Sequence, residues 1–112
     1  MKCLRLTHVN IRVERLDDAV RFYTQVMGLE PIERQDRKGK GAWFRLGATE
    51  VHLAEDGTPQ PRSKRHFAVE VADLAVARRT ADQHRAEIDQ EEEGRFWMRD
   101  PSGNRIEVVQ SR

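Results

Sequence analysis

Two strand-like stretches decide the fold: residues 7–13 read THVNIRV, and residues 66–71 read HFAVEV. In both stretches apolar and polar residues alternate, and a period of two predicts a strand with one apolar and one polar face. His8 and His66 belong to the polar faces. Each strand should therefore turn its histidine away from the side that packs on the core.

A helix is predicted after each of these strands. Apolar residues recur at helical spacing over residues 16–27, and Gly28 suits the left-handed cap that commonly ends a helix. In the second half, Asp73 can cap a helix that runs to about Glu87. The apolar face of this second helix is mostly alanine, so its boundaries are only loosely defined by the spacing.

Three short strands are predicted after each helix. Short runs of β-forming residues between glycine-bearing turns indicate them, and the turn sequence DPSGN at residues 100–104 separates the last two. The predicted strands cover residues 31–35, 42–46 and 49–54 in the first half, and residues 87–90, 95–99 and 105–109 in the second.

The two halves repeat one plan of strand, helix and three strands. His66 occupies the place in the second half that His8 occupies in the first, and Glu107 matches His52 in the same way. The sequence therefore predicts an α+β fold made of two βαβββ modules in a single domain. We expect module one over about residues 4–55, a linker over about 56–64 and module two over about 65–112.

Four side chains of these strands form a candidate metal site. His52 and Glu107 each lie between apolar neighbours in a predicted last strand, so both should face away from the helices, as His8 and His66 do. Three imidazoles and one carboxylate suit zinc, nickel, cobalt, manganese or iron(II). A single carboxylate leaves a dication with net positive charge, which polarises a substrate carbonyl or acidifies bound water.

Each of these residues also has an ordinary structural interpretation. A single strand histidine is most often hydrogen-bonded or half exposed, and Glu107 alone could be a solvated strand residue. The joint pattern favours the metal site, because three of the four histidines fall at repeat-equivalent positions and an acid occupies the fourth position. The remaining histidine, His84, falls in the predicted second helix and is interpreted as a surface residue.

Composition narrows the classes of partner and compartment. Lysine plus arginine number 20 and aspartate plus glutamate 19, so the net charge of +1 gives no electrostatic case for nucleic acid or an anionic membrane. The single cysteine, Cys3, cannot form an intrachain disulfide and fits a reducing cytoplasm. No apolar run approaches the ~18 residues of a membrane span, and no secretory signal is visible. The basic stretch 34–40 is interpreted as a solvated loop.

Five motifs resemble those of the vicinal oxygen chelate superfamily, the group of glyoxalase I, bleomycin-resistance proteins and extradiol dioxygenases. They cover essentially the whole chain and read LTHVNIRV (6–13), FYTQVMGLE (22–30), EVHL (50–53), RHFAVEV (65–71) and RDPSGNRIEVV (99–109). The resemblance implies paired βαβββ modules whose open, barrel-like sheets enclose a metal-binding cleft. It also implies that His8, His52, His66 and Glu107 occupy the family's four ligand positions.

The resemblance further implies chemistry at the vicinal oxygens of a small substrate. Glyoxalase I converts the hemithioacetal of methylglyoxal and glutathione to a thioester, and the glutamate that matches Glu107 can act there as ligand and base. Arg12 matches an arginine that helps to bind the glutathione carboxylate. Two departures bear on glutathione: His52 stands where glyoxalase I usually has a glutamate, and Asp56 replaces a polar amide.

Other functions within the family stay open. A ring-cleaving dioxygenase uses two histidines and a glutamate on iron(II), which match His8, His66 and Glu107, and a fosfomycin-type thiol transferase uses the same three positions. A ligand-binding or drug-sequestering module would use the cleft without chemistry. Family members of this size commonly pair, which implies a homodimer. Each shared metal site would then take His8 and His52 from one chain and His66 and Glu107 from the other.

Several further side chains are candidate substrate contacts. Asn10 and Arg12 share the predicted face of His8, although Arg12 could equally form an ion pair with Glu70 at the rim. Aromatic residues occur as adjacent pairs on two predicted strands, and only one member of each pair can face the cleft. The pairs are Trp43 with Phe44 and Phe96 with Trp97.

Overall fold

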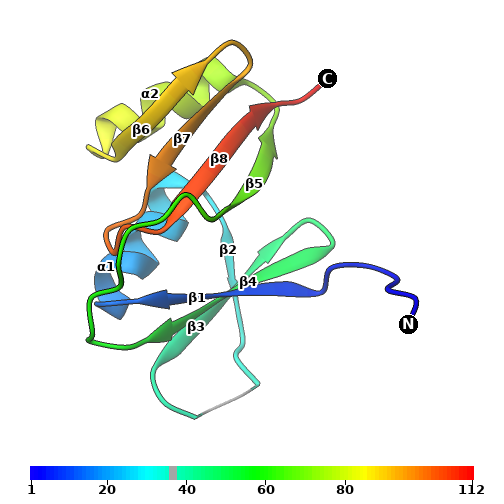
Figure 1. The fold of residues 1–112 in the computed structure, drawn as a ribbon, viewed down its shortest axis with the longest axis vertical. Coiled ribbons are helices and arrows are strands. Elements are labelled where there is room, and N and C mark those ends of the chain that lie inside the picture. The colour runs from blue at the N-terminus through cyan, green and yellow to red at the C-terminus, as the bar shows by residue number, and fades with distance from the viewer. Residues whose placement is uncertain (36–37) are drawn as a thin grey trace.

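The structure is a computed structural model that describes residues 1–35 and 38–112 (Figure 1). Its elements follow one another in two similar halves. The first half contains β1 (His8–Val13), α1 (Leu16–Arg21), the π-helical segment η1 (Phe22–Val26), β2 (Glu30–Ile32), β3 (Gly41–Leu46) and β4 (Thr49–Glu55). The second half contains β5 (His66–Val71), α2 (Leu74–Gln83), β6 (Glu87–Glu92), β7 (Arg95–Arg99) and β8 (Arg105–Gln110).

The strands form two four-stranded sheets of identical topology. Their orders are β1-β4-β3-β2 and β5-β8-β7-β6, with the first and last strand of each half paired in parallel and the other neighbours antiparallel. Each sheet is open, so β1 and β5 are edge strands. In the view of Figure 1 the second sheet lies above the first. This arrangement confirms the predicted α+β fold with two repeated βαβββ modules.

The repeat extends to the hydrogen bonds that begin each helix. The N–H of Leu16 donates to Glu55 Oε2 at 2.9 Å, and the N–H of Leu74 donates to Gln110 Oε1 at 2.9 Å. In each half, the last residue of the fourth strand therefore caps the helix that follows the first strand. Asp73 also accepts a bond from the N–H of Val76 at 3.1 Å, which confirms it as the N-cap of α2.

In the first half, the observed elements differ from the predicted ones in two places. The helix predicted over residues 16–27 changes from α to π geometry at Phe22, and Gly28 follows it in the left-handed conformation with φ of 69°. The strand predicted over residues 31–35 is the three-residue β2. Residues 36–37 of the predicted basic loop lie outside the described residues.

In the second half, the prediction placed the end of the helix too late. α2 ends at Gln83 rather than near Glu87, and Arg85 has a positive φ of 56°. The N–H of Ala86 returns to the carbonyl of Ala81 at 2.9 Å. This left-handed turn redirects the chain into β6, and the alanine-rich helix sequence contained no glycine to mark it.

The apolar faces of both sheets share one core with the helices. The residues on either side of His52 and Glu107 belong to it, so the period-two alternation assigned the faces of β4 and β8 correctly. One aromatic residue of each adjacent pair, Phe44 or Phe96, also lies in this core. The buried strand residues of this core are Val13, Phe44, Val51, Leu53, Phe96, Met98, Ile106 and Val108.

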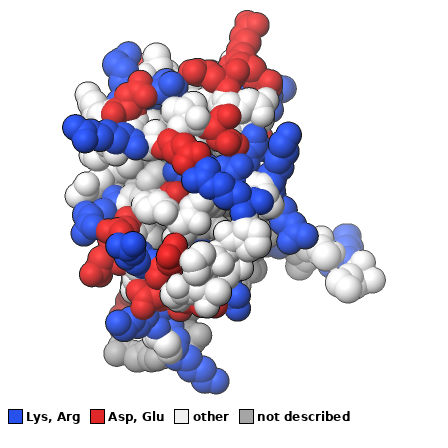
Figure 2. Space-filling model, turned by 60° about the vertical axis from the view of Figure 1, so that its left-hand side comes forward, with Lys and Arg blue, Asp and Glu red and all other residues white. Residues whose placement is uncertain are grey.

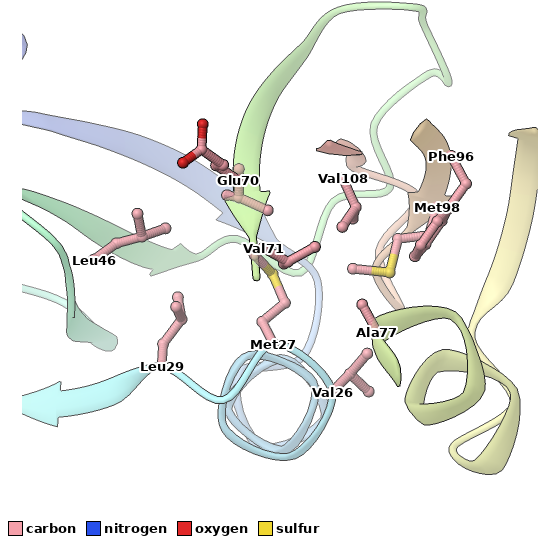
Figure 3. Close-up of a pocket in the computed structure, with 11 residues that line it drawn as sticks. Val26, Met27, Leu29, Leu46, Glu70, Val71, Ala77, Phe96, Met98 and Val108 are labelled. Carbon is pink, nitrogen blue, oxygen red and sulfur yellow. The ribbon is translucent and has the colours of Figure 1, made fainter. Parts of the chain in front are cut away.

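The two halves pack together through η1. Figure 3 shows Val26 of this segment, and Met27 directly after it, pointing toward Val71 and Met98 of the second sheet and toward Ala77 of α2. A small apolar pocket of about 120 Å³ remains among these side chains. The first helix therefore contributes to both modules, which buries apolar surface that neither sheet could cover alone.

A buried hydrogen bond strengthens this junction. The hydroxyl of Tyr23 donates to Asp100 Oδ2 at 2.8 Å, across the two halves. Burial raises the pKa of the Tyr23 hydroxyl well above its usual value, and the negative charge of Asp100 is the second largest cause. The N–H of Glu14 also donates to Ser102 Oγ at 2.8 Å. The turn between β7 and β8 is thus tied to the first half of the chain.

The surface carries both signs of charge. Figure 2 shows acidic and basic side chains interspersed over the face in view rather than segregated into patches of one sign. Among the described residues, no helix is long and apolar enough to cross a membrane.

Candidate metal centre

His52 lies between two rings on the open face of the first sheet. The strand order β1-β4-β3 places His8 on one side of it and Trp43 on the other. The ring centroid of His8 is 4.2 Å from that of His52 with 15° between the planes, and the Trp43 ring is 3.9 Å away at 3°. His52 is only 8% exposed, whereas His8 is open to solvent. Stacking therefore holds the plane of the His52 imidazole.

A carboxylate that the sequence analysis did not single out lies beside this pair. Glu50 Oε1 is 2.8 Å from His52 Nε2, and Glu50 is also the register partner of His8 between β1 and β4. Glu50 precedes His52 by two residues, so strand parity places both side chains on the same face. This alternation was the signal in the sequence that could have identified Glu50, because it places Glu50 on the same face as His52.

The second sheet carries a histidine and a glutamate at the matching place. His66 Nε2 is 3.0 Å from Glu107 Oε1, and Arg95 Nη1 donates to Glu107 Oε2 at 2.9 Å. The Glu107 side chain is 10% exposed and that of His66 31%. Both carboxylate oxygens of Glu107 therefore have partners from neighbouring strands, β5 and β7.

Trp97 lies next to this pair on the open face of the second sheet. It is the register partner of Glu107, and its ring meets the His66 ring edge-on with 6.4 Å between centroids. Its indole Nε1 is buried, and no described residue accepts its hydrogen. Trp43 and Trp97 are thus the members of the two aromatic pairs that face away from the core.

The four predicted metal ligands form two separate pairs in the chain. His8 and His52 lie on the first sheet, and His66 and Glu107 lie on the second. In residues 1–35 and 38–112, no group of three or more His, Cys, Asp or Glu side chains is close enough to hold a metal ion. The described part of one chain therefore holds two candidate half-sites rather than one complete site.

The predicted substrate contacts lie on the first sheet. Asn10 is exposed and is the register partner of His52. Arg12 Nη1 is 3.3 Å from Asp56 Oδ2, so the suggested ion pair of Arg12 with Glu70 is wrong. Hydrogen bonds from Thr58, together with the charge of Arg12, hold the pKa of Asp56 below its usual value.

His84, the histidine without a predicted role, is the C-cap residue that follows α2. It is exposed, and its Nδ1 lies 3.2 Å from the Thr80 carbonyl. This position agrees with its interpretation as a surface residue.

The donor atoms of the second sheet fit a divalent metal ion. Two ligands each about 2.1 Å from one ion, at tetrahedral or octahedral angles, are about 3.0–3.4 Å apart. The 3.0 Å between His66 Nε2 and Glu107 Oε1 falls in that range. His66 Nδ1 lies 2.9 Å from the Lys64 carbonyl. If Nδ1 carries the proton and donates it to that carbonyl, the lone pair of Nε2 is left to bind an ion.

The donor atoms of the first sheet are less well placed to bind one metal ion. The rings of His8 and His52 are nearly parallel, so their nitrogen lone pairs do not converge on one point. His8 is exposed, and its Nδ1 lies 3.1 Å from Thr7 Oγ1, outside the core. Three imidazoles and one carboxylate remain a suitable donor set for a borderline divalent ion.

Solved structures with similar folds include a glyoxalase-family protein, a fosfomycin resistance protein and a glyoxalase I. A protein from Bacillus anthracis that is assigned to the glyoxalase family shares 24% identity, with 100% of this chain and 98% of that chain covered and a TM-score of 0.84. A fosfomycin resistance protein FosX variant from Listeria monocytogenes, complexed with Mn(II) and 1S,2S-dihydroxypropylphosphonic acid, shares 15% identity, with 99% and 95% covered and a TM-score of 0.85. The trypanothione-dependent glyoxalase I of Leishmania major shares 25% identity, with 96% and 87% covered and a TM-score of 0.75.

Sequence comparison identifies the family. No curated protein sequence matches the chain significantly. The family profile described as Glyoxalase/Bleomycin resistance protein/Dioxygenase superfamily matches residues 5–108, which is nearly the whole chain and includes all four candidate ligands. Together with the paired βαβββ modules, this match shows that the chain belongs to the Glyoxalase/Bleomycin resistance protein/Dioxygenase superfamily.

Proposed function

We propose that two copies of this chain form a metal-dependent enzyme of the glyoxalase I type, a lyase or isomerase that acts on a small substrate with vicinal oxygens. The observation that carries the proposal is the pair of His66 and Glu107, whose facing atoms are 3.0 Å apart on an open sheet face. The Mn(II) complex of the structurally similar FosX variant supports a divalent ion in this fold.

A homodimer would supply the ligands that one chain keeps apart. In this proposal, His8 and His52 of one chain meet His66 and Glu107 of the other. Each pair lies on a sheet face that no other part of the described chain completes into a metal site. A two-fold axis would bring unlike pairs together twice and would create two equal sites.

Glu107 is the proposed proton carrier. A zinc, nickel, cobalt, manganese or iron(II) ion, when bound, would polarise the substrate oxygens. The Glu107 carboxylate would accept a proton from one substrate carbon and return it to the adjacent carbon. Arg95 bonds to the second oxygen of Glu107 and so orients the carboxylate.

The open faces also offer substrate contacts. Asn10 and Arg12 can reach polar groups of a substrate from β1, and Trp43 and Trp97 provide flat apolar walls. The buried Nε1 of Trp97 has no acceptor among the described residues.

Glu107→Gln is the direct test of this chemistry, because it keeps the shape of the side chain and removes the base. With hemithioacetals of methylglyoxal as substrates, formed with glutathione or another thiol, we expect turnover to fall by about 10²–10⁴-fold. Bound metal per chain, measured by elemental analysis, should fall far less. Glu93→Gln, at an exposed turn, is the matched control. Full turnover in Glu107→Gln would refute the proton-transfer role.

A metal-free ligand-binding module is the second candidate function. One observation favours it: within one chain, His52 Nε2 already contacts Glu50, and Glu107 Oε2 already contacts Arg95. Protein purified without added metal salts separates the two candidates. About one divalent ion per chain supports the enzyme, whereas tight ligand binding without metal supports the binding module. An iron-rich preparation would instead favour ring-cleaving dioxygenase chemistry.

A further inference from the structure

A groove lined by His66, but not by Glu107, lies between the edge strands β1 and β5. Its volume is about 410 Å³, and the linker between the halves and the turn between β7 and β8 close its sides. Pockets of roughly 300–1,000 Å³ are typical of small-molecule sites. Four arginines line the groove: Arg12, Arg65, Arg99 and Arg105. Among the described residues, none that lines it is acidic.

The buried arginines of this groove are only partly neutralised. Arg99 Nη2 and Arg105 Nε both donate to the same oxygen of Asp89, at 3.1 and 2.6 Å. Their side chains are 8% and 5% exposed. The single carboxylate of Asp89 therefore pairs with two buried guanidinium groups. The pair carries one more positive charge than this carboxylate neutralises, in a region of reduced dielectric.

The exposed arginines of the groove add a second positive charge. Arg12 is matched by Asp56 at 3.3 Å. Arg65 is exposed, and in the described part of the chain its guanidinium has no acidic partner. The four guanidinium groups thus face two carboxylates, which leaves an excess of two positive charges.

The groove also contains an unused buried donor. Arg99 Nη1 donates to the carbonyls of Ser63 and Gly103, but its Nε is buried and has no partner among the described residues. A buried donor without an acceptor costs free energy, which an anionic oxygen would recover. Asn10 and Gln60 place further amide groups on the lining.

We propose that this groove binds a small anion that carries two negative charges, such as a phosphoryl or a dicarboxylate group. Its guanidinium groups match the planar geometry of such oxygens, and its excess charge matches theirs. The groove meets the candidate metal centre at His66, whose Nδ1 lies 3.4 Å from Arg105 Nη1. The groove also shares Asn10 and Arg12 with the proposed substrate contacts. Anion binding requires neither a metal ion nor a second chain, so its failure and the failure of the proposed enzyme activity are distinguishable.

Titration calorimetry on metal-free protein, prepared with a chelator, tests the site. Inorganic phosphate and malonate should both bind, and acetate, with one charge, should bind more weakly. Arg65→Gln removes an exposed cation without disturbing a described ion pair, and we expect it to weaken phosphate binding about fivefold. Arg79→Gln, at an exposed position of α2 outside the groove, is the matched control and should bind phosphate normally.

Ser63→Asp is the stronger variant. Ser63 Oγ accepts the N–H of Arg65 at 3.2 Å, and an aspartate can accept the same bond, so the local turn is preserved. The added carboxylate should compete with the ligand and abolish measurable phosphate binding. Phosphate binding that needs added metal, or that survives both Arg65→Gln and Ser63→Asp, would overturn the proposal. Absence of binding to the wild-type protein at millimolar phosphate would do the same.

Discussion

The two sheets use one backbone plan to hold different side chains on their open faces. In the first sheet, β4 presents His52 between the rings of His8 and Trp43. In the second sheet, β8 presents Glu107 between His66 and Arg95, and Glu107 contacts both. The repeated backbone therefore determines where the side chains point, and the residue at each point determines the chemistry.

The charges beside the two pairs are opposite. Glu50 lies against His52 in the first sheet, whereas Arg95 lies against Glu107 in the second. The first half-site thus offers two imidazoles beside a carboxylate, and the second offers an imidazole and a carboxylate beside a guanidinium group. If the two halves meet across a dimer, each supplies what the other lacks, and the comparison can be tested by exchanging or removing these groups.

The largest effect is expected from mixing two inactive variants. His52→Ala breaks the first half-site, and Glu107→Gln breaks the second. In a shared-site dimer, random mixing makes half of the dimers mixed, and each mixed dimer keeps one intact site of two. Activity should therefore rise from near zero to about a quarter of the wild-type value. The measurement is turnover after unfolding and refolding the two variants together.

The control for this mixing experiment is each variant refolded alone. If both pairs serve one site within the same chain, mixing cannot restore an intact site, and activity stays at background. That outcome would contradict the shared-site arrangement and leave the two half-sites unconnected.

Removing Glu50 or Arg95 should change metal affinity in opposite directions, with effects smaller than those of the mixing experiment. Glu50→Gln removes a negative charge beside His52 and should weaken metal binding by about tenfold. Arg95→Gln removes the cation that competes for Glu107 and should strengthen metal binding by a similar factor. Competition with a chelator of known affinity measures both. Changes of the same sign in the two variants would show that local charge is not the cause.

Acid should weaken the second sheet through Asp89. The hydrogen bond from Arg105, followed by the bond from Arg99, holds the pKa of Asp89 below its usual value. Its folded-state pKa is thus below its unfolded-state pKa, so its stabilising effect is present above about pH 4 and is lost as the pH falls through the folded value. We expect Asp89→Asn to lower the urea midpoint at pH 7, with a difference from wild type that narrows toward pH 3. A pH-independent difference would contradict this assignment.

The smallest effect concerns the two helix caps. Glu55 and Gln110 accept equivalent bonds, but only Glu55 carries charge at a helix N-terminus. Glu55→Gln makes the first cap resemble the second and should cost about 0.3–1 kcal/mol in unfolding free energy at low salt, and less at 1 M salt. Chemical denaturation measures it, with Glu93→Gln as control. An equal cost at both salt concentrations would point to geometry rather than charge.

Much of the fold could be predicted because it depends on local alternation. The period of two assigned the faces of β1, β4, β5 and β8, and the matching positions of His8 and His66 revealed the repeat. The end of α2 could not be predicted, because the left-handed turn at Arg85 has no glycine to signal it. The π geometry of η1 was equally unmarked, since its residues also fit an α-helix.

The candidate site also has a part that the sequence predicts and a part that it does not. Alternation placed His52 and Glu107 on open faces, but it treats Glu50 and Arg95 identically, so only the contacts in the structure single them out. Parity also could not decide whether Trp43 or Phe44 faces the core. That choice depends on where β3 pairs with β4, because the register puts Trp43 opposite His52.

The sequence by itself determined which side chains leave the core, because each strand alternates its faces regardless of what surrounds it. Only the tertiary structure decided that the pair His8 and His52 lies apart from the pair His66 and Glu107, and that four arginines converge on a groove between β1 and β5. The physical reason is that the position of one module against the other depends on how η1 and the turn at Asp100 pack, through contacts between residues far apart in the chain.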